Sequence, residues 1–143
     1  MIMDTTRYAS LLGRLLIGLP FVFTGVGKLA SYGATTAYIA SAGLPVPPAA
    51  YAIAVLVELG GGLLLIAGYQ ARSVALALAV FSLATAAVFH GNFADQNQMI
   101  HFLKNVMMAG GLLQIVAFGA GALSLDARLS RDGDVLPGAV PAR

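Results

Sequence analysis

Residues 8–29 read YASLLGRLLIGLPFVFTGVGKL, an apolar stretch that contains only two charged residues, Arg14 and Lys28. A membrane-spanning helix needs about 20 consecutive, mostly apolar residues, and this stretch has that length. The long apolar run, the internal Arg14 and the lack of a small-residue cleavage site favour a retained helix over a cleaved signal peptide. The stretch therefore predicts that the chain crosses a membrane near its N-terminus.

Three further stretches have the length and composition of membrane spans. They cover residues 49–68, 73–90 and 99–123, and the segments between them are rich in Gly, Pro or polar residues. Four spans joined by such connectors predict an all-α fold, a membrane-spanning four-helix antiparallel bundle. Residues 1–125 are expected to form this transmembrane domain, and residues 126–143 a flexible cytoplasmic tail.

The overall composition agrees with a membrane protein and excludes several other classes. Of the 143 residues, 59% are hydrophobic and 10% are charged, whereas a soluble domain has about 25% charged residues. The net charge is only +2 and basic runs are absent, so no nucleic-acid partner is expected. The chain has no cysteine, which rules out disulfides, thiolate chemistry and cysteine-ligated metals.

The distribution of basic residues predicts the orientation in the membrane. If the four helices alternate in direction, one side carries most of the arginines, whereas Lys28 is the clear basic residue at the opposite boundary. Because Lys and Arg near span ends favour the cytoplasmic side, both termini are expected to face the cytoplasm. The arginines on that side are Arg7, Arg72, Arg128, Arg131 and Arg143.

Small residues recur at helical spacing and indicate which faces pack together. Helices in lipid pack through small residues that let their backbones approach closely. The stripes that contain them place Arg14, Lys28 and Glu58 toward the bundle interior. They consist of Arg14, Gly18, Phe21, Gly25 and Lys28 in the first span, Ala50, Ala54, Glu58, Gly61 and Gly62 in the second, and Ala75, Ala79, Ser82 and Ala86 in the third.

Glu58, near the middle of the second span, is the strongest functional signal. A carboxylate at that depth costs at least ~2.5 kcal/mol and must be paired, protonated or hydrated. At ~1.5 Å per residue, Arg14 is expected roughly 7 Å toward the cytoplasm from it, and Lys104 roughly 10 Å toward the outside. Arg14 is the first choice as its partner and Lys104 the second. The pair either lines a working cavity or only joins two helices.

A second polar cluster is predicted in the outer half of the bundle. His101, Lys104 and Asn105 share one helix face, and His90 and Lys28 end other spans at similar depth. The five side chains are candidates for lining an outer polar pocket. The alternative is that the lysines extend to the membrane surface and the histidines cap helix ends. No metal site is expected, since only Asp95 or Glu58 could join the two histidines.

Six short segments of the spans and their connectors follow one another in a distinctive order. They are RLLIGLPFVFTGVGK (residues 14–28), GLPVP (43–47), ELGGGLLL (58–65), FH (89–90), HFLKN (101–105) and GGLL (110–113). Their order and spacing resemble the DoxX-like family of integral membrane proteins, in particular its YphA-like inner-membrane branch. The resemblance covers about residues 11–125 and implies a four-helix bundle in the bacterial cytoplasmic (inner) membrane.

The family resemblance also implies a redox association, because the family name comes from a subunit of a thiosulfate:quinone oxidoreductase. Since this chain has no cysteine, a redox role would need a bound quinone or an oxidoreductase partner subunit. One hypothesis is therefore a quinone-interacting subunit without a catalytic centre of its own. The other is a non-catalytic small-solute carrier or membrane assembly factor, for which homo-oligomerisation would enlarge the path. Aromatic walls for a quinone are expected from Phe21, Phe89, Phe102 and Tyr51.

Overall fold

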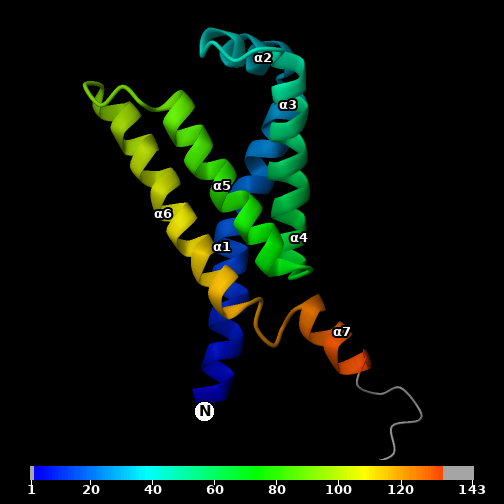
Figure 1. The fold of residues 1–143 in the computed structure, drawn as a ribbon. Coiled ribbons are helices and arrows are strands. Elements are labelled where there is room, and N and C mark those ends of the chain that lie inside the picture. Colours follow the sequence, from blue (N-terminus) through cyan, green and yellow to red (C-terminus); the bar gives the residue numbers. More distant parts are fainter. Residues whose placement is uncertain (1, 134–143) are drawn as a thin grey trace, which may run out of the picture.

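The fold comes from a computed structural model, of which residues 2–133 are described. These residues form α-helices with one π-helical turn, η1. In chain order the elements are α1 (Ile2–Ala30), α2 (Tyr32–Ser41), α3 (Pro47–Val55), η1 (Leu56–Gly60), α4 (Gly61–Ala67), α5 (Ala71–Phe89), α6 (Gln96–Phe118) and α7 (Leu125–Gly133). Figure 1 shows them in sequence colours.

The four predicted spans are confirmed, with small shifts at their ends. The spans are Thr5–Ala30, Pro47–Ala67, Ala71–Phe89 and Gln96–Phe118. The second is one continuous rod built from α3, η1 and α4. The fourth ends before residue 123 because Gly119 adopts a φ of 82°, in the left-handed region that stops a helix.

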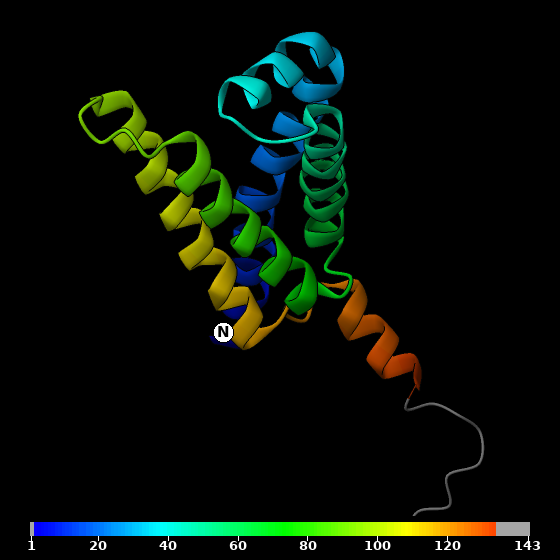
Figure 2. The ribbon, with the colours of Figure 1, turned by 45° about the horizontal axis from the view of Figure 1, so that its top comes forward.

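The four spans form two pairs. The rod α3–η1–α4 packs along α1, and α5 packs along α6. In Figures 1 and 2 the pairs lie close together near the end that carries α7 and separate toward the end that carries α2. The first helix begins at the α7 end, so both ends of the described chain lie at the same end of the bundle.

Glycines bring α1 and the second span into close contact. A Cβ atom on Gly25 would lie 2.9 Å from the backbone nitrogen of Leu59, and one on Gly62 would lie 3.0 Å from the carbonyl oxygen of Gly18. A larger residue at any of the three glycines would push the two helices apart. These contacts set the antiparallel register, with residue 18 opposite residue 66, residue 22 opposite residue 62 and residue 25 opposite residue 59.

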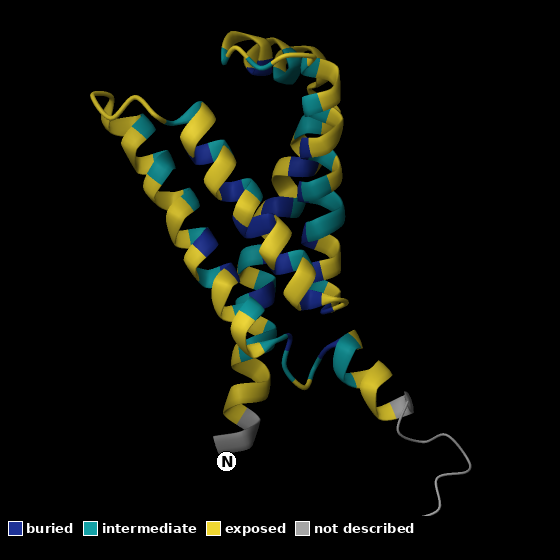
Figure 3. Cartoon of the chain, viewed as in Figure 1, coloured by how far each residue is buried: buried dark blue, intermediate teal, exposed yellow. Residues whose placement is uncertain are grey.

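Burial follows the predicted small-residue stripes, while the outer faces stay apolar. Figure 3 shows buried positions concentrated where the helices meet. Large apolar side chains such as Leu16, Phe23 and Met107 point outward, as expected for surfaces in contact with lipid. The buried apolar core consists of Phe21, Leu65, Ala75, Leu78, Ala79, Ala109 and Leu112.

Two segments expected to be irregular contain helices. The first connector includes α2, which lies across one end of the bundle (Figure 1). The expected flexible tail begins with α7, because its first residues are anchored. The carboxylate of Asp126 accepts hydrogen bonds from the backbone nitrogens of Gln70 (2.7 Å) and Ala71 (2.9 Å), at the start of α5. Residues 134–143 of the tail lie outside the described part of the chain.

Candidate functional site

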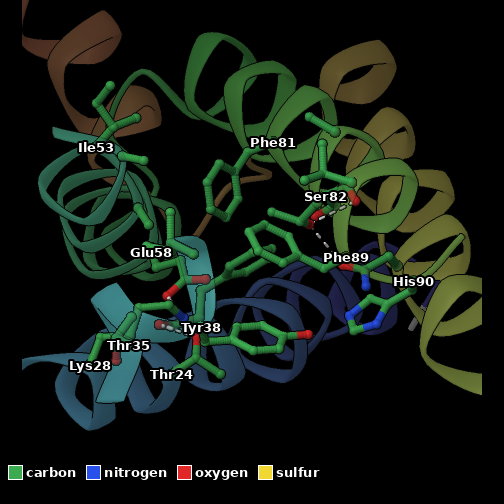
Figure 4. A pocket seen from close by; sticks show the side chains of 18 of the residues that line it. Thr24, Lys28, Thr35, Tyr38, Ile53, Glu58, Phe81, Ser82, Phe89 and His90 are labelled. Atoms are coloured by element: carbon green, nitrogen blue, oxygen red, sulfur yellow. Dashed lines mark hydrogen bonds and ion pairs between the residues drawn. The ribbon is translucent and has the colours of Figure 1, made fainter. Parts of the chain in front are cut away.

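A cavity of about 490 Å³ lies between the two helix pairs, in the half of the bundle that carries α2. Its walls come from α1, α2, the second span, α5 and α6, and they are mostly apolar. Figure 4 shows Lys28 and Glu58 on one side and Ser82 and His90 on the other, with aromatic rings between them. The polar side chains that line it are those of Thr24, Lys28, Thr35, Tyr38, Glu58, Ser82, Thr85, His90 and Asn105.

The charged group of this cavity is an ion pair between Lys28 and Glu58. Lys28 Nζ lies 2.6 Å from Glu58 Oε2, with 26% and 10% of the two side chains exposed. The partner expected for Glu58 from the sequence is Arg14, with Lys104 as second choice. The structure corrects that expectation. Lys28 was placed in the outer cluster, and it proves to be the counter-ion of Glu58.

The helix register explains why Lys28 and not Arg14 reaches Glu58. Because residue 25 of α1 lies opposite residue 59, residue 26 is level with Glu58, and Lys28 lies only two residues further along, or ~3 Å on the helix axis. Arg14 lies instead near the far end of the second span. Counting depth separately along each helix missed this, because it assumed where each helix enters the membrane.

The π-helical turn at residues 56–60 sets the direction of Glu58. One wider turn in an otherwise α-helical span changes the angular phase of the residues on either side of it. Here the turn contains the buried carboxylate and is followed directly by Gly61, which contacts Leu78 of α5, and by Gly62, which contacts α1. Such turns occur frequently at functional sites in helical proteins.

Arg14 is fully buried, and its guanidinium group forms hydrogen bonds with backbone carbonyl oxygens. Its Nη1 donates to the carbonyl oxygens of Leu65 (3.2 Å) and Ile66 (2.8 Å), and its Nη2 donates to the carbonyl oxygen of Leu123. The first two carbonyls belong to the last turn of α4, where helix carbonyls lack partners within the helix. Arg14 therefore joins α1 to the end of α4 and to the segment after α6.

Three of the five residues of the predicted outer pocket line the cavity: Lys28, His90 and Asn105. The ring of His101 stacks on that of His90 with centroids 5.1 Å apart, so His101 packs against a wall residue but does not itself line the cavity. Lys104 lies on the exposed face of α6 and does not line the cavity. The alternative of a lysine that extends to the membrane surface describes Lys104 better.

Hydrogen bonds hold two of these polar residues in place. His90 Nδ1 lies 2.8 Å from Gln98 Oε1, across the turn between α5 and α6. Asn105 Nδ2 donates to the carbonyl oxygen of His101, and its Oδ1 accepts from the Thr85 hydroxyl at 3.5 Å. The polar wall therefore depends on contacts between α5 and α6.

Of the four predicted aromatic wall residues, Phe21 and Phe89 line the cavity. Phe102 packs edge-on against Phe93, and the Tyr51 hydroxyl donates to the carbonyl oxygen of Lys28. Tyr38 from α2 takes part in their place, stacked on Phe89 with centroids 5.3 Å apart. Its position was missed because residue 38 lies in a segment expected to be a connector.

Ser82 is a cavity residue that the sequence did not single out as a candidate site residue. Its side chain is 1% exposed and lines the cavity, and its hydroxyl has no hydrogen-bond partner among the described residues. The spacing placed it on a small-residue face, which only indicated close packing. Within residues 2–133 no group of three or more His, Asp or Glu side chains is arranged to hold a metal ion.

Comparisons with known proteins identify the family. A family model described as DoxX matches residues 9–91. The chain belongs to the DoxX family. The inner membrane protein YqjF of Escherichia coli (strain K12) is 37% identical over 121 residues, which cover 85% of this chain and 92% of that protein.

A second relative covers the DoxX chain to a similar extent. The inner membrane protein YphA of the same organism is 36% identical over 141 residues, 88% of this chain and all of that protein. No solved structure matches the chain. With four confirmed spans and two inner membrane relatives, this DoxX protein is a multi-pass protein of the inner membrane.

Proposed function

We propose that the protein is a quinone-interacting, redox-associated membrane subunit whose cavity holds the ring of a quinone. The observation that carries this proposal concerns Ser82, which lines the cavity and whose buried hydroxyl has no hydrogen-bond partner within residues 2–133. Leaving a buried hydroxyl unpaired costs about 1–3 kcal/mol, so a ligand that accepts its hydrogen bond gains that interaction. A quinone carbonyl is such an acceptor.

The shape and chemistry of the cavity support a flat, mostly apolar ligand. A volume of about 490 Å³ lies within the usual range for small-molecule sites, and the walls combine apolar surface with few polar groups. The rings of Phe21, Phe81 and Phe89 offer surfaces against which a ring can pack. An isoprenoid tail would extend toward lipid.

The Lys28–Glu58 pair supplies exchangeable protons at the cavity wall. Reduction of a quinone to a quinol takes up two electrons and two protons. A lysine and a carboxylate 2.6 Å apart can pass a proton toward a bound ring. Since the chain has no cysteine, the electrons would come from an oxidoreductase partner subunit.

The test is equilibrium binding of a short-chain quinone to the purified full chain in lipid nanodiscs. Ser82→Ala removes the donor and little volume, and should weaken binding about 3–10-fold, the value of one hydrogen bond. Ser73→Ala, on the same helix but away from the cavity, is the matched control and should bind like the wild type.

Two outcomes would overturn the quinone assignment. One is the absence of saturable quinone binding by the wild type, and the other is equal affinity of the Ser82→Ala variant and the wild type. If the cavity instead bound a polar solute, and transport in vesicles depended on Ser82, the small-solute carrier hypothesis would take its place.

A further inference from the structure

A second hollow lies at the opposite end of the bundle, where α7 meets the starts and ends of the spans. Its volume is about 790 Å³, and it is more open than the cavity described above. Neither the quinone proposal nor the family assignment uses it. It is lined by Arg7, Ala67, Ala122, Leu123, Ser124, Leu125, Arg128 and Arg131.

The hollow concentrates positive charge. Three of its lining residues are arginines, Arg7 from α1 and Arg128 and Arg131 from α7, and none is acidic. All three arginine side chains are exposed, and they come from opposite ends of the sequence. The fold therefore brings together guanidinium groups that are more than a hundred residues apart in the chain.

The walls of the hollow are held by hydrogen bonds from Ser124, Asp126 and Arg14, and Arg131 Nε donates to the carbonyl oxygen of Ala127 at 3.0 Å. Ser124 is buried, and its hydroxyl donates to the carbonyl oxygen of Gly121 and accepts from the backbone nitrogen of Ala127. The backbone nitrogen of Asp126 donates to the carbonyl oxygen of Gly68 at 2.9 Å. Arg14 Nη2 donates a hydrogen bond to the carbonyl oxygen of Leu123. The start of α7 is therefore fixed against α4.

The depth of the hollow matches the boundary of the membrane. The second span ends at Ala67 and the fourth at Phe118, and Arg7 lies just inside the start of the first. On α7, Leu125 and Leu129 are one turn apart and exposed, as in a helix that lies at the membrane surface. A ligand in the hollow would sit at the level of lipid headgroups.

We propose that Arg7, Arg128 and Arg131 bind the phosphate of an anionic phospholipid headgroup. Guanidinium groups bind phosphate oxygens through paired hydrogen bonds, and basic pockets beside membrane helices bind anionic lipids. Leu123 and Leu125 offer apolar contacts for the acyl chains beside the phosphate. Zwitterionic phospholipids carry no net charge and bind the hollow more weakly.

The experiment measures binding of phosphatidylglycerol and phosphatidylcholine, with identical acyl chains, to the purified full chain by native mass spectrometry. The wild type should prefer phosphatidylglycerol. The triple variant R7Q/R128Q/R131Q should lose the preference, with a decrease of roughly fivefold for each arginine removed. Since all three side chains are exposed, the melting temperature in detergent should stay close to that of the wild type.

Matched variants separate a built site from general attraction. Arg72→Gln removes an exposed arginine at the same end that does not line the hollow, so it should keep the preference. The triple lysine variant R7K/R128K/R131K keeps the charge but loses the paired hydrogen bonds, and should bind with intermediate affinity.

Three results would overturn the proposal. The first is a wild type without preference for phosphatidylglycerol. The second is an equal loss in Arg72→Gln, which would indicate general surface charge. The third is complete competition by inorganic phosphate, added as a separate arm, which would indicate a site for free phosphate instead of a lipid.

Discussion

Lys28 Nζ lies 2.6 Å from Glu58 Oε2 and joins the last turn of α1 to the π-helical turn of the second span. The pair also forms part of the cavity wall. It therefore links the packing of two helices to the polarity of the candidate ligand site. A variant that breaks it is expected to affect both.

The two partners of this ion pair should be energetically coupled, because removing one of them leaves the other charge without its counter-ion. Lys28→Met and Glu58→Gln should each lower the free energy of unfolding by about 2 kcal/mol, below the ~3–5 kcal/mol of a fully buried pair, because 26% of the Lys28 side chain stays exposed. The double variant should lose less than the sum of the two. Chemical unfolding in mixed micelles measures this coupling energy.

Arg14 provides the control for that cycle. Arg14→Gln and Glu58→Gln should be additive, because Arg14 is bonded to the carbonyls of Leu65, Ile66 and Leu123 and not to Glu58. Coupling between Arg14 and Glu58 together with additivity of Lys28 and Glu58 would contradict the observed pairing.

The sequence allowed the spans to be predicted, but not the contacts between them. Apolar length alone defines a span, so all four were found within a few residues of their ends. The partner of Glu58 depends on register, which the close contacts of Gly18 and Gly25 with the second span determine. Periodicity cannot supply that register, and it also cannot show that one turn, residues 56–60, is π-helical.

The hydrogen bonds from Arg14 to backbone carbonyls should make Arg14 contribute more to stability than the exposed Arg72 does. Arg14→Met leaves three carbonyl oxygens without their donor and should cost about 3 kcal/mol, since each buried unpaired group costs ~1–3 kcal/mol. Arg72→Met, an exposed arginine at the same end, should change stability by less than about 0.5 kcal/mol. Thermal unfolding in detergent compares the two. Equal effects would refute a structural role for the Arg14 bonds.

Two glycines should respond to alanine in opposite directions. Gly68 has a φ of 69°, and a Cβ there would lie 2.5 Å from Ser124 Cβ, so Gly68→Ala should be destabilising. Gly33 lies inside α2 with no atom close to an added Cβ, so Gly33→Ala should stabilise by about 0.5–1 kcal/mol. Melting temperatures of the two variants should fall on either side of the wild type. A stable Gly68→Ala variant would show that α7 can shift away from α4.

The orientation in the membrane, with both termini in the cytoplasm, is a prediction that the arrangement of the arginines supports. Arg7, Arg72, Arg128 and Arg131 all lie at the α7 end, and Arg143 lies outside the described residues. At the other end Lys28 is held by Glu58, so its charge is balanced there. A reporter fused to the C-terminus should therefore give a cytoplasmic signal. A periplasmic signal would reverse the assignment for both ends of the chain.

Asn105 and Lys104 are neighbours in the sequence, yet only Asn105 should affect ligand binding. Asn105 lines the cavity and bonds to Thr85, whereas Lys104 points away from it. Asn105→Leu keeps the volume and removes the polar amide, so a short-chain quinone should bind about 3–10-fold more weakly, as for the loss of one hydrogen bond.

Lys104→Met tests the other face of the same helix. This substitution should leave quinone affinity unchanged, because the side chain lies on the exposed face of α6. Isothermal titration of both variants in nanodiscs compares them directly. If Lys104→Met weakened binding and Asn105→Leu did not, the ligand would lie on the outer face of α6, and the cavity between the helix pairs would not be the quinone site.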